Sequence, residues 1–206
     1  MADPPDAQIL WWVQQGDYRA FTLLFDRYYP SIERYAACLL RDPRAAGRAA
    51  SAAMENGFRD ARRPRQPRCG YPAHLFLLCR RAAFRVGKRS DLPRRAFVPA
   101  LWPSEPDAVE RDALPLSVIL SRERDKQVRR AYDGLSAGDR EIIHLAFEPV
   151  LRREDLAAIL KCPSERAVTD RLLRALSRLG AAVLRSPGGG AALPGAHYAE
   201  RSASNG

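Results

Sequence analysis

The chain has 206 residues, enough for one ordinary domain or two small ones, and it carries a formal net charge of +10 at pH 7. This balance favours a polyanionic partner, either nucleic acid or an anionic membrane surface. No run approaches the roughly eighteen apolar residues that cross a bilayer, and the start lacks the features of a secretory signal, so we expect a cytoplasmic protein without membrane insertion.

Apolar residues at helical spacing predict helices along most of the chain, and no segment shows a strand period of useful length. In the first half we expect helices over residues 7–15, from a cap at Asp17 to about 29, from Pro30 to about 41, and over 44–61 and 72–88. In the second half we expect helices over residues 120–133, 138–147 and 153–160, followed by one that Ser164 caps. The predicted fold class is all-α.

Proline and glycine divide these helices into two modules. Residues 1–89 form the first module, and residues 120–185 form the second. Residues 90–119 contain five prolines, which preclude a long helix and predict a flexible linker. Residues 186–206 begin with Ser-Pro-Gly-Gly-Gly and predict a disordered tail.

Residues 135–179 show the pattern of a helix-turn-helix. A short helix ends at Lys161-Cys162-Pro163, and the helix after Ser164 has an apolar stripe that includes Val168 and Leu172. Arg171, Arg174 and Arg178 share another face of that helix. A short helix, a tight turn and a basic helix can place side chains in a major groove.

The excess positive charge is concentrated in one segment. Residues 59–95 contain 12 Lys or Arg and 2 Asp or Glu, which equals the entire net charge of the chain. Such a local excess predicts a nucleic-acid surface rather than a general aid to solubility. Six phosphate contacts there give a logarithmic salt slope of roughly −5.

The two modules resemble regions 2 and 4 of bacterial RNA polymerase sigma factors of the extracytoplasmic-function group. The amino-terminal motifs are Gly16-Asp17, Ala20-Phe21, Leu24-Phe25, Arg27-Tyr28-Tyr29-Pro30, Arg34-Tyr35-Ala36 and Leu39-Leu40-Arg41-Asp42-Pro43. The carboxy-terminal motifs are Leu135-Ser136, Asp139-Arg140-Glu141, Glu154-Asp155-Leu156-Ala157, Arg171-Leu172, Arg174-Ala175 and Arg178-Leu179. Together they extend over most of residues 7–184.

The resemblance implies a promoter-recognition subunit that binds core RNA polymerase and promoter DNA, with an anti-sigma factor as a further expected partner. Region 4 would read the upstream promoter element with Ser164, Arg166, Ala167, Thr169, Asp170, Arg171 and Arg174. Region 2 would bind and help melt the downstream element with Arg62, Arg63, Arg65, Arg68, Tyr71, Arg80, Arg81, Arg85, Lys88 and Arg89. Polymerase binding would involve Asp26, Arg27, Arg48, Met54 and Glu55.

Aromatic residues beside the basic segment are candidates for stacking on an unpaired base. Such stacking contributes about 1–3 kcal/mol per base. Tyr71 and Phe76 are the candidates, although helical spacing favours a core position for Phe76.

Region 2 departs from the family pattern at the polymerase-docking helix. The family's acidic residues are replaced by Ala46-Gly47-Arg48 and Ser51-Ala52, and Arg81 and Arg85 stand where Asn and Asp are usual. These changes support an alternative function: a sigma-like paralogue that acts as a DNA-binding regulator, or as an adaptor that contacts polymerase or another sigma factor, without initiating transcription by itself. A membrane-surface protein is disfavoured, because prolines interrupt the basic segment.

Enzymatic, metal and cofactor chemistry are not expected. The chain has no phosphate-binding glycine loop and no nucleophile elbow. The spacing of Cys69, His74 and Cys79 matches no common zinc pattern. His144 lies near Glu141 and Glu148 on a predicted helix, but a lone histidine beside carboxylates is usually a structural residue.

Overall fold

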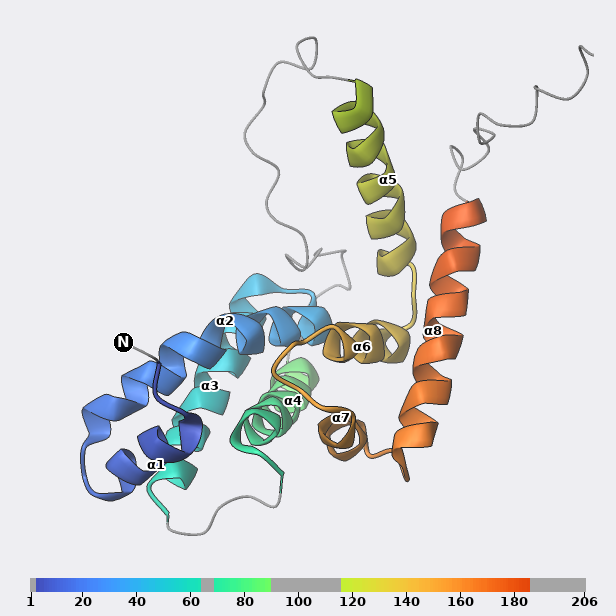
Figure 1. Ribbon diagram of the computed structural model, residues 1–206. Coiled ribbons are helices and arrows are strands. Elements are labelled where there is room, and N and C mark those ends of the chain that lie inside the picture. Colours follow the sequence, from blue (N-terminus) through green and yellow to red (C-terminus); the bar gives the residue numbers. More distant parts are fainter. Residues whose placement is uncertain (1–2, 64–68, 90–115, 186–206) are drawn as a thin grey trace, which may run out of the picture.

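The computed structural model describes residues 3–63, 69–89 and 116–185, and every regular element in these ranges is a helix (Figure 1). This confirms the predicted all-α class. The elements are α1 (Asp6–Gln14), the 3-10 helix η1 (Tyr18–Ala20), α2 (Phe21–Leu40), α3 (Pro43–Ala61), α4 (Tyr71–Arg89), α5 (Leu116–Asp133), α6 (Ala137–Ala146), α7 (Arg153–Leu160) and α8 (Glu165–Arg185). Most of the predicted linker, residues 90–115, and the predicted tail, residues 186–206, lie outside the described residues.

Helices α2, α3 and α4 pack together and form the core of the first half. The alanine-rich sequence of α3 allows a close approach, because its buried face carries mainly methyl groups: Ala45, Ala46, Ala49, Ala50 and Ala53 are all buried. Where α3 meets α4, Gly57 allows a close approach, since a Cβ atom there would lie 2.4 Å from Leu75 Cδ2 and would force that side chain to move.

Pro30 does not begin a new helix, as the sequence predicted, but lies inside α2. Proline removes one backbone hydrogen bond, and this usually ends or kinks a helix. Here the exposed Pro30 is flanked by Tyr28 and Ile32, both of which are buried in the core. Packing on both sides of the proline explains why the two predicted helices form one.

The second half is built around α8, which contacts α5, α6 and α7. Ser136 caps α6, because its Oγ accepts the backbone N–H of Asp139 at 3.1 Å. Leu156 and Ile159 of α7 are buried, as is Val168 of α8. Helix α5 begins at Leu116, inside the predicted linker.

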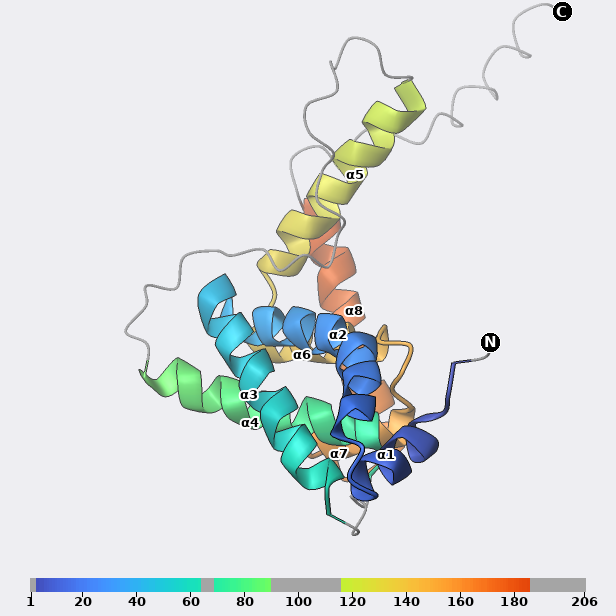
Figure 2. The same cartoon turned by 90° about the vertical axis from the view of Figure 1, so that its left-hand side faces the viewer.

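The two halves lie against each other. Helix α6 packs on α2 and α7 packs on α4, while α5 and α8 extend away from the first half (Figures 1 and 2). This arrangement leaves one side of α8 open and covers part of α2 and α4.

Candidate nucleic-acid interface

Helices α7 and α8 are joined by a short, well-defined connection. Lys161 adopts a left-handed conformation with φ of 55°, which ends α7. The Oγ of Ser164 then accepts the backbone N–H of Ala167 at 3.2 Å, so the predicted cap is confirmed. The connection fixes the direction in which α8 leaves α7.

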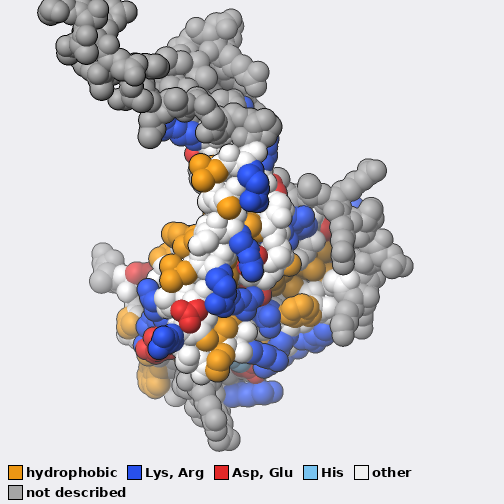
Figure 3. Space-filling view, turned by 90° about the vertical axis from the view of Figure 1, so that its right-hand side faces the viewer, with side chains coloured by type: hydrophobic (Ala, Val, Ile, Leu, Met, Phe, Trp, Pro, Cys, Tyr) orange, Lys and Arg blue, Asp and Glu red, His pale blue; other side chains and the backbone are white. Residues whose placement is uncertain are grey.

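Helix α8 fully buries only a narrow stripe. Val168 and Ala175 are its buried residues. Of the side chains predicted to read the upstream element, Ser164, Arg166, Asp170 and Arg174 are exposed, and Ala167, Thr169 and Arg171 are partly buried. Basic side chains gather along this face of the molecule (Figure 3).

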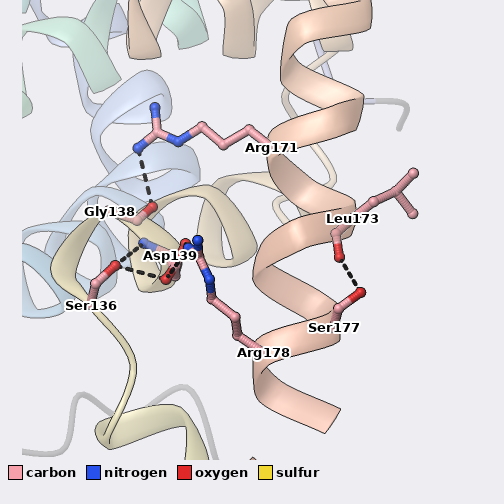
Figure 4. Close-up of polar contacts among 7 residues, drawn as sticks. All are labelled: Ser136, Gly138, Asp139, Arg171, Leu173, Ser177 and Arg178. Atoms are coloured by element: carbon pink, nitrogen blue, oxygen red, sulfur yellow. Dashed lines mark hydrogen bonds and ion pairs between the residues drawn. The ribbon is translucent and has the colours of Figure 1, made fainter. Parts of the chain in front are cut away.

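Arg171 and Arg178 point from α8 toward the start of α6 (Figure 4). The guanidinium of Arg171 donates to the carbonyl of Gly138 at 3.2 Å, and that of Arg178 contacts Asp139 Oδ1 at 2.9 Å. These bonds hold α8 to α6. The predicted basic face of three arginines is therefore divided: Arg171 and Arg178 bond to α6, although the Arg178 side chain remains 61% exposed, and Arg174 is exposed.

Thr169 is also engaged within the chain. Its hydroxyl donates to the carbonyl of Glu165 at 3.1 Å and accepts from Arg153 Nη1 at 2.8 Å. Arg153, which was not among the predicted DNA contacts, therefore lies beside the predicted reading face. Its position in α7, one helix earlier, gave no sequence signal for this contact.

Of the predicted basic residues that follow α3, Arg62 lies beside aromatic rings. Arg62 places its Cζ 4.6 Å from the ring centre of Tyr18 and donates to the Tyr18 hydroxyl at 3.1 Å. Arg63 pairs with Asp60 at 3.3 Å. Arg65 and Arg68 lie outside the described residues.

Within α4 the predicted basic residues have different environments. Arg80 is tied to the second half, because its Nε donates to Glu141 Oε1 at 2.7 Å. Arg81 and Arg85 are exposed. Lys88 and Arg89 are the last two residues of the helix, and their side chains are not among the described parts of the structure.

Tyr71 does not have the accessible ring that base stacking requires. Its side chain is only 5% exposed, and this burial raises the pKa of its hydroxyl. The prediction of stacking at Tyr71 is thus corrected, because the first turn of α4 faces the core. Phe76 is fully buried 5.2 Å from the ring of Tyr35, so its predicted core position is confirmed.

The predicted polymerase-binding residues fall into two groups. Asp26, Arg48 and Glu55 are exposed. Arg27 binds Asp3, Asp6 and the carbonyl of Pro4, so its guanidinium holds the amino-terminal segment on α2. Met54 is 2% exposed, so only a small part of its side chain is open at the surface.

An apolar groove of about 420 Å³ opens between α2 and α3 beside these residues. It is lined by Tyr18, Phe21, Thr22, Phe25, Ser51, Met54, Glu55 and Phe58. Tyr18 is 48% exposed and Phe25 is 37% exposed, so aromatic surface remains open to solvent. Phe21 and Phe25 lie at helical spacing in the sequence, but spacing alone does not show that Phe25 extends beyond the core.

Two of the residues considered for metal chemistry have partners within the first half. Cys79 is buried and donates to the Ile32 carbonyl at 3.6 Å, and His74 lies 2.9 Å from Asp60. In the part of the chain that is described, no group of three or more His, Cys, Asp or Glu side chains could hold a metal ion. None of the described helices is long and apolar enough to cross a membrane.

Compared with known families and with curated proteins, the chain matches no family model and no curated sequence.

Proposed function

We propose that this chain is a sigma-type promoter-recognition subunit, which binds core RNA polymerase and directs it to particular promoters. The observation that carries the proposal is the outward face of α8. Arg171 and Arg178 bond this helix to α6, and Arg166 and Arg174 are exposed to solvent. A rigid helix with exposed arginines is suited to a major groove, where arginine reads guanine or binds phosphate.

Two further surfaces support the proposal. The exposed Arg81 and Arg85 of α4 provide a second basic patch for the opened strand of the downstream element. The groove between α2 and α3 supplies an apolar docking surface whose lining includes the exposed Glu55. A subunit of this kind needs two surfaces that bind DNA and one that binds polymerase. The polymerase performs the chemistry.

A second candidate is a sigma-like regulator or adaptor that does not initiate transcription by itself. It is favoured by the replacement of the family's acidic docking residues with Ala46, Gly47 and Arg48 on α3. Ala46 is buried and Arg48 is exposed, so the charge that this stretch offers to a partner is positive instead of acidic.

Pull-down with core polymerase, followed by run-off transcription without any other sigma factor, separates the two candidates. We expect stoichiometric capture of polymerase and promoter-dependent transcripts. DNA binding without transcripts would favour the regulator, and failure to bind either polymerase or DNA would contradict both.

Replacement of single arginines on α8 tests the reading face. We expect Arg174→Ala to weaken binding to a promoter duplex about tenfold and to lower the logarithmic salt slope by about 1, because one contact to DNA is lost. Arg178→Ala is the matched control on the same helix. Its guanidinium is bound to Asp139, and we expect an affinity within about threefold of the native chain. Fluorescence anisotropy at several salt concentrations measures both, and equal losses would contradict the assignment.

A further inference from the structure

A cavity of about 460 Å³ lies between the two halves of the chain. Its walls come from four helices, α2 and α4 of the first half and α6 and α8 of the second half. This volume is within the range of about 300–1,000 Å³ that is usual for small-molecule sites. The side chains that line the cavity indicate which class of small molecule it fits.

Much of the cavity wall is apolar. Leu39 and Leu40 of α2 line it together with Ala83 and Phe84 of α4. The Phe84 side chain is 55% exposed, so a large part of its ring is not covered by the protein. An open aromatic ring beside aliphatic side chains favours a flat apolar ligand that stacks on the ring.

Three charged side chains line the same cavity, and two of them neutralise each other. Arg80 Nε donates to Glu141 Oε1 at 2.7 Å. The Arg80 guanidinium also lies against Phe84, with its Cζ 5.0 Å from the ring centre. Arg80 and Glu141 therefore have their partners without any ligand.

Arg171 of α8 supplies the remaining charge. Its Nη2 donates to the carbonyl of Gly138 at 3.2 Å (Figure 4), and no carboxylate pairs with it among the described residues. A guanidinium has five N–H donors, and a carbonyl is a neutral acceptor. The lining therefore carries two arginines and one glutamate, a net charge of +1, which a single carboxylate would balance.

We propose that this cavity is a binding site for a small aromatic carboxylate. The ring of the ligand stacks on Phe84, and its carboxylate binds the guanidinium of Arg171. The ligand contacts both halves, so its binding also stabilises the folded chain. The inference is independent of the promoter-recognition proposal, because it needs neither DNA nor polymerase.

Isothermal titration calorimetry of the full chain with 2-naphthoate tests the site. We expect saturable binding of one molecule per chain. Two compounds with the same rings are controls, the neutral 2-naphthalenemethanol and the cationic 2-naphthylmethylammonium. We expect each of them to bind at least about tenfold more weakly. No saturable binding of 2-naphthoate up to about 1 mM, or equal affinities for the three compounds, would overturn the proposal.

Arg171→Ala and Arg178→Ala are a matched pair, because both arginines bond α8 to α6 but only Arg171 lines the cavity. We expect Arg171→Ala to weaken the affinity for 2-naphthoate at least about tenfold, since the ligand loses its charged partner. We expect Arg178→Ala to bind within about threefold of the native chain. Equal losses would mean that the packing of α8 on α6 controls binding, and the assignment of the carboxylate to Arg171 would be wrong.

Phe84→Ala removes the ring on which the ligand stacks, and Phe147→Ala removes an exposed ring outside the cavity. We expect the first change to weaken binding about tenfold and the second to leave it unaltered.

Gly87→Leu adds a side chain inside the cavity, because a Cβ atom at Gly87 lies 3.4 Å from Leu40 Cδ2. We expect it to abolish binding. Gly180→Leu is its control on α8, where a Cβ atom meets nothing within 4 Å. Circular dichroism confirms the helical content of each variant. Native affinity in either Phe84→Ala or Gly87→Leu would place 2-naphthoate elsewhere on the chain and contradict the site.

Discussion

Acidification from pH 7 to pH 4 will lower the free energy of unfolding of the native chain by about 3 kcal/mol more than that of a His144→Phe variant. His144 is 4% exposed, and burial lowers its pKa from 6.5 to about 4, with the charge of Arg34 as a second cause. In the unfolded chain the imidazole takes up a proton near its usual pKa. Between pH 6.5 and 4 the unfolded chain therefore binds more protons than the folded one, so stability falls as the pH falls.

The phenylalanine variant is a close match in shape. The ring of His144 stacks on Tyr35 with centroids 5.8 Å apart, and a phenyl ring can occupy the same place. The change also removes two buried nitrogens that have no partner among the described residues. Urea unfolding followed by circular dichroism at pH 7, 6, 5 and 4 measures the difference, because carboxylates that titrate in this range are common to both proteins. Parallel pH profiles for the two proteins would show that His144 is not buried as a neutral ring.

Local signals in the sequence were sufficient for much of the secondary structure. The bounds of α7 agree with the prediction over residues 153–160, because Pro163 and the Ser164 cap define where the next helix begins. The alanine-rich α3 also lies where it was expected. Pro30 misled the prediction, since its effect on α2 depends on core packing that no local signal contains.

The predicted binding residues were harder to assign, because periodicity shows which side chains share a face but not what that face meets. Arg80 and Glu141 are 61 positions apart in sequence and bind each other at 2.7 Å. Arg178 of α8 likewise bonds to Asp139 of α6, 39 positions earlier in the sequence. Each pairing depends on how α6 packs against the neighbouring helices. Counting arginines in the sequence therefore overestimates the positive charge that is available to a polyanion, because some of these arginines are paired with carboxylates of the same chain.

The groove between α2 and α3 leads to the second large expected effect. Phe25 lies at the rim of the groove, and its ring stacks on Tyr29 with centroids 4.7 Å apart. The Phe25 ring is 37% exposed, and its stacking on Tyr29 already fixes its orientation. A partner that covers the ring therefore does not pay the entropy cost of ordering this side chain. Aromatic anchors of this kind often dominate the affinity of a protein interface.

Under the proposed function, Phe25→Asp will weaken binding to core polymerase at least about thirtyfold, which corresponds to about 2 kcal/mol. The change places a charge in an apolar docking surface, where it loses water without gaining a partner. Phe147→Asp is the matched control, because Phe147 is 71% exposed at the end of α6 and lies outside the groove. Surface plasmon resonance with immobilised polymerase measures both variants. Equal affinities for the two would place the polymerase contact elsewhere, whereas a selective loss for Phe25→Asp would identify the groove as the docking surface even though α3 lacks the acidic residues usual in the family.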